Sequence, residues 1–270
     1  MRPVITAVAL ALGLAFGAPA PAHGLRINHD SCGFTTDYDV RVDAGGVAFD
    51  RAESTPSHVF MHDGRLRVDG RDLAVSAADA ARLRQYESQV RALLPEVAGI
   101  AREGVDIGFA AMSTVAATFA DDEASRRRVV EQLDQRRQQA LAQIDRGLGR
   151  GVWKPHDLDS LVKESVGDSV SSLVSTVTAS AVKAALSGDQ AQVKALQARA
   201  DALDRRIDKE VNARADRLQA RAEALCPRLT ALEQLQQQWQ VRLHDGSPLQ
   251  LMERDDASSA SARKPEVARR

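Results

Sequence analysis

The sequence predicts an α+β protein in which a small N-terminal antiparallel β-hairpin sheet precedes a long-helix bundle or a coiled-coil hairpin. Between residues 38 and 75, short apolar runs alternate with Asp-Gly and Gly-Gly pairs, which is typical of strands joined by tight turns. From residue 76 to about 245, apolar residues recur every three or four positions, the period of an amphipathic helix.

The strands are expected at 38–42, 47–49, 59–61 and 66–68, and the last two each end at an Asp-Gly pair. Asp-Gly pairs tolerate the positive φ angles of hairpin turns, so the region is predicted to be a run of hairpins. A sheet this small needs cover on its apolar face, and we expect the helices to supply it.

The first helix is expected to open with Ser76 as its N-cap. Pro95 marks a boundary or a kink, because a proline disfavours the α region for the residue before it. A second helix is expected over about 98–120 and a third from the acidic residues 121–123 to about Arg146.

A leucine-rich stripe then runs from Val193 to Trp239. It predicts one long amphipathic helix, or two that meet near Cys226-Pro227. An additional four-residue step around Ile207 and Val211 breaks a strict heptad repeat and favours a packed bundle or a short coiled-coil hairpin.

Residues 165–187 carry small side chains at every fourth position: Gly167, Ser171, Ser175 and Ala179. On a helix these residues share one face, which would let a neighbouring helix approach closely. The alternative is a membrane-active or oligomerising face, but Lys163, Asp168 and Lys183 favour packing within the protein. Contact of this segment with a membrane stays an open alternative.

The N-terminus has the pattern of a secretory signal peptide. Arg2 precedes an uncharged apolar run over residues 4–16, and Ala20-Pro21-Ala22 offers a small-x-small cleavage site. We expect cleavage after Ala22 and a mature protein that begins at His23, outside the cytoplasm. A retained membrane anchor is the alternative; the apolar run is short for a spanning helix, and no later segment is long and uncharged enough to cross a bilayer.

Cys32 and Cys226 are the two cysteines of the chain. Two thiols in an oxidising compartment usually pair, so a Cys32–Cys226 disulfide is expected. Two free buried thiols, or a redox or metal site, are the alternatives; the absence of a C-x-x-C motif argues against a redox site.

The charge and the motifs exclude several function classes. Removing residues 1–22 changes 36 basic and 37 acidic residues to 35 and 37, and a net charge of −2 gives no general attraction for nucleic acid. The glycine-rich loop 147–151 lacks a phosphate-binding motif, although Trp153 and His156 just beyond it form a candidate interaction loop.

The sequence offers no catalytic, cofactor-binding or metal-binding constellation. It lacks the G-x-S-x-G motif of serine hydrolases. His58 and His62 would share a strand face beside Asp63, but two exposed histidines explain this spacing better than a metal site does. These observations favour a non-catalytic protein over an enzyme.

The stretch from His62 to Gly70, followed by Leu73, Tyr86 and Leu93-Leu94-Pro95, resembles the YggN-like family of bacterial periplasmic proteins of unknown function. The similarity spans about Cys32 to Leu243. The resemblance implies a periplasmic location and places both cysteines at the positions of the family's cysteines. It implies no activity and no catalytic residues.

We therefore expect a signal peptide over 1–22, a β-hairpin region over 23–75, a helical bundle over 76–245 and a disordered tail over 246–270. The favoured hypothesis is a non-catalytic binding or structural protein of the envelope, whose bundle binds an unidentified envelope protein or component, or a second copy of itself. A carrier or sensor of apolar ligands or of the membrane surface is one alternative. An enzyme acting near the 147–156 loop is the other.

Overall fold

The computed structural model describes residues 33–52, 54–120, 122–154 and 188–254. It also describes part of the segment between the last two ranges: residues 167, 170, 171, 174, 175, 177–179, 182 and 186. The expected signal peptide, Cys32, His156 and the chain after residue 254 lie outside the described residues, as does most of the small-residue segment.

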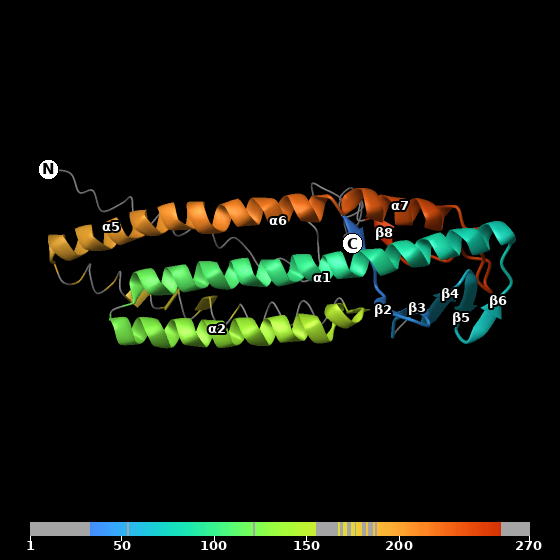
Figure 1. Cartoon of the computed structure of the whole chain (residues 1–270), viewed down its shortest axis with the longest axis horizontal. Helices are drawn as coiled ribbons and strands as arrows, with labels where there is room; N and C mark the ends of the chain where they lie inside the picture. Colours follow the sequence, from blue (N-terminus) through green and yellow to red (C-terminus); the bar gives the residue numbers. More distant parts are fainter. Residues whose placement is uncertain are drawn as a thin grey trace, which may run out of the picture.

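The expected hairpins form five strands of a six-stranded antiparallel sheet, in the order β6-β5-β4-β3-β2-β7 (Figure 1). Asp63 and Asp69 both have positive φ angles and each is followed by a glycine with positive φ, which is the backbone that a tight hairpin turn requires. The Asp-Gly prediction is therefore confirmed. The strand bounds are Asp39–Asp43 (β2), Gly46–Asp50 (β3), His58–His62 (β4), Arg65–Val68 (β5), Arg71–Leu73 (β6) and Val152–Trp153 (β7).

The edge strand β7 comes from the end of the glycine-rich loop, far along the chain from its partner β2. The Val42 N–H donates to the Gly151 carbonyl at 2.7 Å, and Val40 pairs with Trp153. Gly151 has a φ of 82°, and a Cβ there would collide with the Val42 carbonyl oxygen. The loop, which includes the short helix η2 (Leu148–Arg150), thus ends in the sheet edge, and its last glycine is needed for that pairing.

Helix α1, Ala77–Phe119, begins where the sequence predicts. The Ser76 side chain accepts a hydrogen bond from the Asp79 N–H at 3.0 Å, as an N-cap does. The expectation of two helices separated near Pro95 is wrong, because α1 continues through the proline. Buried Leu93, Leu94 and Ala98 flank Pro95, and their packing offsets a cost of about 3 kcal/mol for a proline inside a helix.

Helix α2, Glu123–Arg146, matches the expected third helix, and its N-cap Asp122 accepts from the Ser125 N–H. The chain later returns alongside α1 through α5 (Gln190–Ile207), η4 (Asp208–Asn212), α6 (Ala213–Glu223) and α7 (Cys226–Gln237) (Figure 1). A turn separates α6 from α7 directly before Cys226, so the expected junction near Cys226-Pro227 is confirmed. Pro227 lies in the first turn of α7, where no N–H donor is needed.

Segment η4 is a π-helix, and it lies where the apolar stripe departs from the heptad repeat. Successive steps of four residues from Ile207 to Val211 to Ala215 would rotate the stripe away from α1 on a regular α-helix. A π-turn absorbs one residue, and Val211 is accordingly buried. The additional four-residue step in the sequence therefore has a local structural cause.

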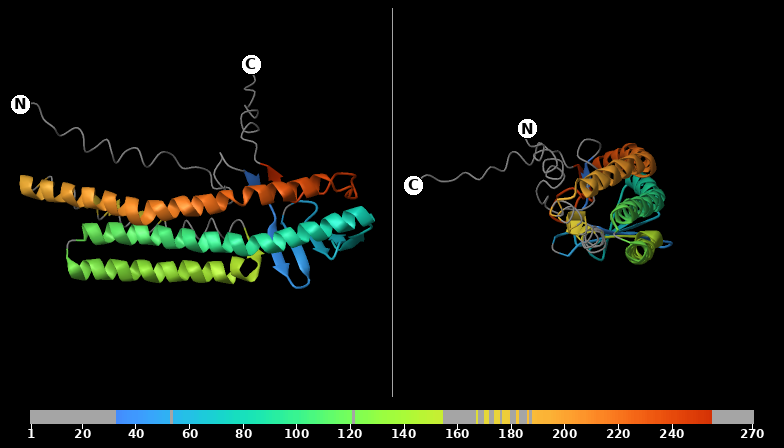
Figure 2. Two further views of the ribbon diagram at one scale, coloured as in Figure 1. Left: turned by 45° about the horizontal axis from the view of Figure 1, so that its top comes forward. Right: turned by 90° about the vertical axis from the view of Figure 1, so that its left-hand side faces the viewer.

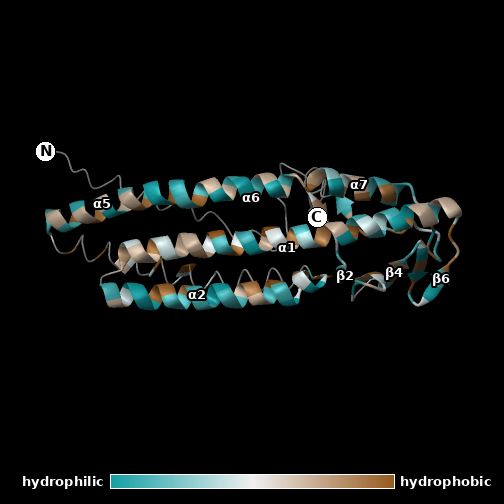
Figure 3. Cartoon of the chain, in the orientation of Figure 1, coloured by the Kyte–Doolittle hydropathy of each residue, from teal (hydrophilic) through white to brown (hydrophobic). Residues whose placement is uncertain are grey.

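Two hydrophobic clusters share α1. The first lies between the inner face of the sheet, the N-terminal half of α1, α7 and the segment after it; the second lies between the C-terminal half of α1, α2 and Leu148. The left view of Figure 2 shows an elongated molecule in which the sheet lies toward one end and the helices extend away from it. In Figure 3, hydrophilic residues predominate along the ribbon of α6. None of the described helices is long and apolar enough to cross a membrane.

The two ends of the described chain pair with each other. Strand β1 (Phe34–Thr35) is antiparallel to β8 (Glu253–Arg254), and the Thr36 hydroxyl donates to the Leu251 carbonyl at 2.7 Å. The expectation of a disordered tail from residue 246 is therefore wrong for 246–254. Leu249, Leu251 and Met252 are buried in the first cluster, which also contains Trp239 and residues of the sheet.

Candidate functional site

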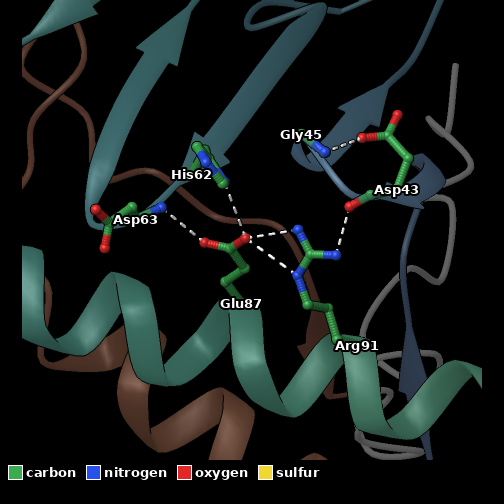
Figure 4. Close-up of polar contacts among 6 residues, drawn as sticks. All are labelled: Asp43, Gly45, His62, Asp63, Glu87 and Arg91. Carbon is green, nitrogen blue, oxygen red and sulfur yellow. Dashed lines mark hydrogen bonds and ion pairs between the residues drawn. The ribbon is translucent and has the colours of Figure 1, made fainter.

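A buried polar arrangement that joins α1 to the sheet is built around Glu87 of α1 (Figure 4). Glu87 is only 7% exposed, although a lone carboxylate is costly to bury. Its Oε2 accepts from the Asp63 N–H at 2.9 Å, and its Oε1 accepts from Arg91 Nη2 at 2.8 Å and Nε at 3.1 Å. His62 Nδ1 lies 3.4 Å from the same Oε1. The carboxylate is thus surrounded by donors.

Arg91 continues this arrangement to a second turn. Its Nη1 donates to the Asp43 carbonyl, while the Asp43 carboxylate accepts from the Gly45 N–H at 2.8 Å (Figure 4). Glu87 and Arg91 lie one helical turn apart on α1, as an i, i+4 ion pair. The pair therefore joins one turn of α1 to both the β2–β3 turn and the β4–β5 turn.

The electrostatics of Glu87 follow from two opposing effects. Burial raises its pKa, but the hydrogen bonds from Arg91, the Asp63 N–H and His62 outweigh burial and hold the pKa of Glu87 below its ordinary value. The carboxylate is therefore ionised at neutral pH, and all its contacts are those of the charged form. These contacts therefore connect α1 to the sheet, and they depend on the negative charge of the carboxylate.

The two histidines of β4 each contact a different acid. His58 Nδ1 lies 2.5 Å from Asp50 Oδ1, whereas His62 faces Glu87. Four residues along a strand span about 13 Å, so a single metal ion cannot bind both rings. In the part of the chain that the structure describes, no group of three His, Cys, Asp or Glu side chains gathers as a metal site.

The candidate interaction loop is only partly described. Trp153 lies in β7, half-buried, and packs against both hydrophobic clusters. His156 lies outside the described residues. Trp153 is placed where it joins the sheet core to the helical core.

A second set of buried hydrogen bonds holds the C-terminal segment against α7. The side chain of Gln236 in α7 is buried, donates to the Met252 carbonyl at 2.8 Å, and accepts from the N–H groups of Leu251 and Met252. Cys226 begins the same helix, and the described part of the chain contains no free cysteine. Cys32, its predicted partner, lies outside the described residues.

The exposed large hydrophobic residues of the described chain lie in one stretch of the sequence. Among the described residues, the large hydrophobic side chains classed as exposed all lie between residues 174 and 193: Val174 (44% exposed), Val182 (50%), Leu186 (82%) and Val193 (47%). In α5, which follows directly, no residue is buried. Figure 1 shows that α5 begins beyond the ends of α1 and α2, away from the sheet. We call Leu186 and Val193 the arm tip.

Sequence reasoning missed Glu87, Arg91 and Gln236. One signal for Glu87 was present: it lies four residues after Leu83 and three before Val90, on the apolar face of the helix. A charged residue on such a face requires a partner when buried. The identity of the partners depends on turns that only the folded sheet brings near.

Comparison with known families gives one match. Residues 32–252 match the family described as "Protein of unknown function (DUF2884)". The matched range runs from just before β1 to just before β8, so it covers nearly the whole described fold. Neither a curated protein nor a solved structure matches the chain.

Proposed function

The chain belongs to the DUF2884 family, and we propose that it is a non-catalytic periplasmic protein that binds a partner protein of the cell envelope through its arm tip. The observation that carries this proposal is that, among the described residues, the exposed large hydrophobic side chains all lie between residues 174 and 193. Exposed apolar residues that occur singly need no explanation, but their concentration in one segment is typical of an interaction site.

The architecture supports a division of roles. The sheet end holds the larger hydrophobic cluster and the paired chain ends, so it supplies the stability of the fold. Helix α5, which we call the arm, extends away from the sheet end and has no buried residue (Figure 1). A binding surface at the far end of this arm can contact a partner without disturbing the hydrophobic cluster at the sheet end.

The arm-tip proposal predicts a selective loss of binding. Leu186→Glu places a charge in the proposed interface, so the partner recovered with the wild-type protein from native envelopes should fall at least tenfold. Ala198→Glu is the matched control, because Ala198 is exposed on α5 about opposite the stripe. Quantitative mass spectrometry of the co-isolated proteins measures both. Equal recovery with the two variants would refute the arm tip as the interface.

A membrane surface or an apolar ligand is the alternative occupant of the arm tip. A partner protein would bind the apolar side chains of the arm tip in a specific interface. Binding to a lipid surface would involve no specific protein. Co-sedimentation with vesicles of phosphatidylethanolamine and phosphatidylglycerol distinguishes them. Vesicle binding that Leu186→Glu abolishes, with no protein lost from the co-isolation, would replace the partner-protein proposal.

The periplasmic location is part of the proposal and rests on the N-terminal sequence and on the resemblance to YggN-like proteins. We expect the mature protein to be found in the periplasmic fraction with His23 as its first residue. N-terminal sequencing of the protein from fractionated cells measures this. A protein that keeps Met1 and stays in the cytoplasm would contradict the location, and Ala20→Leu with Ala22→Leu should block the cleavage.

A Cys32–Cys226 disulfide also belongs to the proposal. Its support is the neighbourhood of Phe34, two residues after Cys32. The Arg254 guanidinium lies 4.7 Å from the Phe34 ring centroid and 2.8 Å from Glu233 of α7. Through Arg254, the chain just after Cys32 is therefore linked to the helix that begins at Cys226. This link between the start of the described chain and α7 supports the proposal; the disulfide itself requires the Cα atoms of the two cysteines to lie within about 7 Å of each other.

A further inference from the structure

We propose that Glu87 is an acid-sensitive latch that holds two turns of the sheet against α1 and releases them when its carboxylate is protonated. The latch is a conformational device at the sheet end and is independent of the proposed binding at the arm tip. It depends on three features of Glu87: the number of donors it accepts from, its link to Arg91, and its burial.

The first feature is that the groups facing Glu87 are donors. An ionised carboxylate has two acceptor oxygens, and here they accept from the Asp63 N–H and from Arg91, with His62 at 3.4 Å. Protonation converts one oxygen into a hydroxyl donor that would point at other donors. At least one of the contacts must then be lost, and the positive charge of Arg91 loses its partner.

The second feature is that the two turns depend on each other through Arg91. The Arg91 guanidinium is oriented by two hydrogen bonds to Glu87 Oε1 while its Nη1 donates to the Asp43 carbonyl. A neutral Glu87 therefore frees both the β4–β5 turn and the β2–β3 turn. The other charged groups at these turns are the Asp43 carboxylate, which accepts from the Gly45 N–H, the Asp63 carboxylate, and Arg84, which lies beside Gly64.

The third feature sets the direction of the response. The pKa of Glu87 is raised by burial but lowered on balance by its donors, so the folded protein holds the proton less tightly than the unfolded chain does. The stabilisation is therefore fully present above a pH of about 4.5 and is lost as the pH falls through the lower pKa of the folded state. Release is expected only in this acidic range.

The apolar contacts beneath the latch do not titrate in that range. Met61 and Leu66 of the hairpin and Leu83 of α1 are fully buried in the first cluster. Burial raises the pKa of Tyr86, so its hydroxyl stays neutral in acid as well. We therefore expect the turns to open while the strands stay packed on α1.

Hydrogen exchange of the full mature chain tests the latch, with rates corrected for the intrinsic effect of pH. In the wild type, protection of the amides at residues 43–46 and 62–65 should fall by about tenfold to a hundredfold as the pH is lowered from 6 through the titration of Glu87. Glu87→Gln should show the low protection already at pH 7 and little further change with pH. Asp72→Asn is the control, because the Asp72 carboxylate is exposed, its pKa is also lowered, by Arg67, and it lies on the edge strand β6.

Wild-type turns that keep their protection through the titration of Glu87 would overturn the proposal, as would a Glu87→Gln protein with the wild-type pH profile. If the Glu87→Gln protein fails to fold, a pH titration of the wild-type protein tests the proposal on its own. The ¹³C resonance of the Glu87 carboxyl group and the Asp63 amide resonance should then titrate together, with a midpoint below 4.5. Separate midpoints would refute the coupling.

Discussion

Replacing Trp239 by alanine is expected to lower the free energy of unfolding by about 3–5 kcal/mol, the range for deleting a large buried aromatic side chain. Trp239 is 6% exposed and packs edge-to-face on Tyr86 with ring centroids 5.0 Å apart. It lies where α1, α7 and the C-terminal segment meet in the first cluster. A cavity there would loosen all three at once.

Urea unfolding followed by circular dichroism measures this loss, and two controls calibrate it. Trp239→Phe keeps most of the buried volume and should cost distinctly less than the alanine variant. Leu196→Ala removes a half-exposed side chain of α5 and should cost well below 2 kcal/mol, since little apolar surface is returned to water. A loss for Trp239→Ala no greater than that for Leu196→Ala would contradict the central position of Trp239.

Replacing Cys226 by serine is expected to lower the free energy of unfolding by about 2–4 kcal/mol if the Cys32–Cys226 disulfide forms. The bond would close a loop of nearly the whole mature chain. Chain entropy alone predicts a value on the order of 5 kcal/mol for such a loop, which usually exceeds what is measured. The loss should appear in the wild type as well when a reductant is added.

Alkylation under denaturing conditions provides the matching measurement. Wild-type protein isolated from the periplasm should take up label at both cysteines only after reduction. Cys32→Ser should match Cys226→Ser in stability, because either change opens the same loop, and the double variant should lose no more than one single variant. Full labelling without reductant would contradict the disulfide.

The local elements of the fold could be predicted because their signals are local. Asp63-Gly64 and Asp69-Gly70 adopt the positive φ angles that their residue types favour, and Ser76 caps α1 through a contact three residues away. The four-residue step at Ile207 and Val211 was visible as a break in the heptad, and the structure explains it by a π-turn. In each case the decisive interaction spans a few residues.

The remaining elements depend on pairings between distant residues. Strands β1, β7 and β8 are two residues long and acquire their structure from partners such as Val40 for Trp153 and Phe34 for Arg254. The continuation of α1 through Pro95 likewise depends on tertiary packing that local propensity does not contain. The burial of Leu249 and Leu251 required knowing that Gln236 would bind the backbone beside them.

The candidate sites were also only partly predictable from the sequence. The apolar stripe that begins at Val193 was evident in the sequence, but the exposure of Val193 itself was not, because an amphipathic face is normally expected to be covered. Glu87 could be recognised as a charged residue on an apolar helix face. Its link to the two turns could not be predicted, because it depends on the sheet register that brings Asp63 and Asp43 to α1.

The central claim is that the arm tip contacts a partner protein, and site-specific photocrosslinking in living cells tests it most directly. A photoreactive amino acid at Leu186 should form an adduct with one defined envelope protein, while the same amino acid at Ala198 should form none. Both positions are exposed, so each probe is equally free to react. Adducts of the same pattern and yield at both positions, or reaction with lipid alone at Leu186, would contradict the claim.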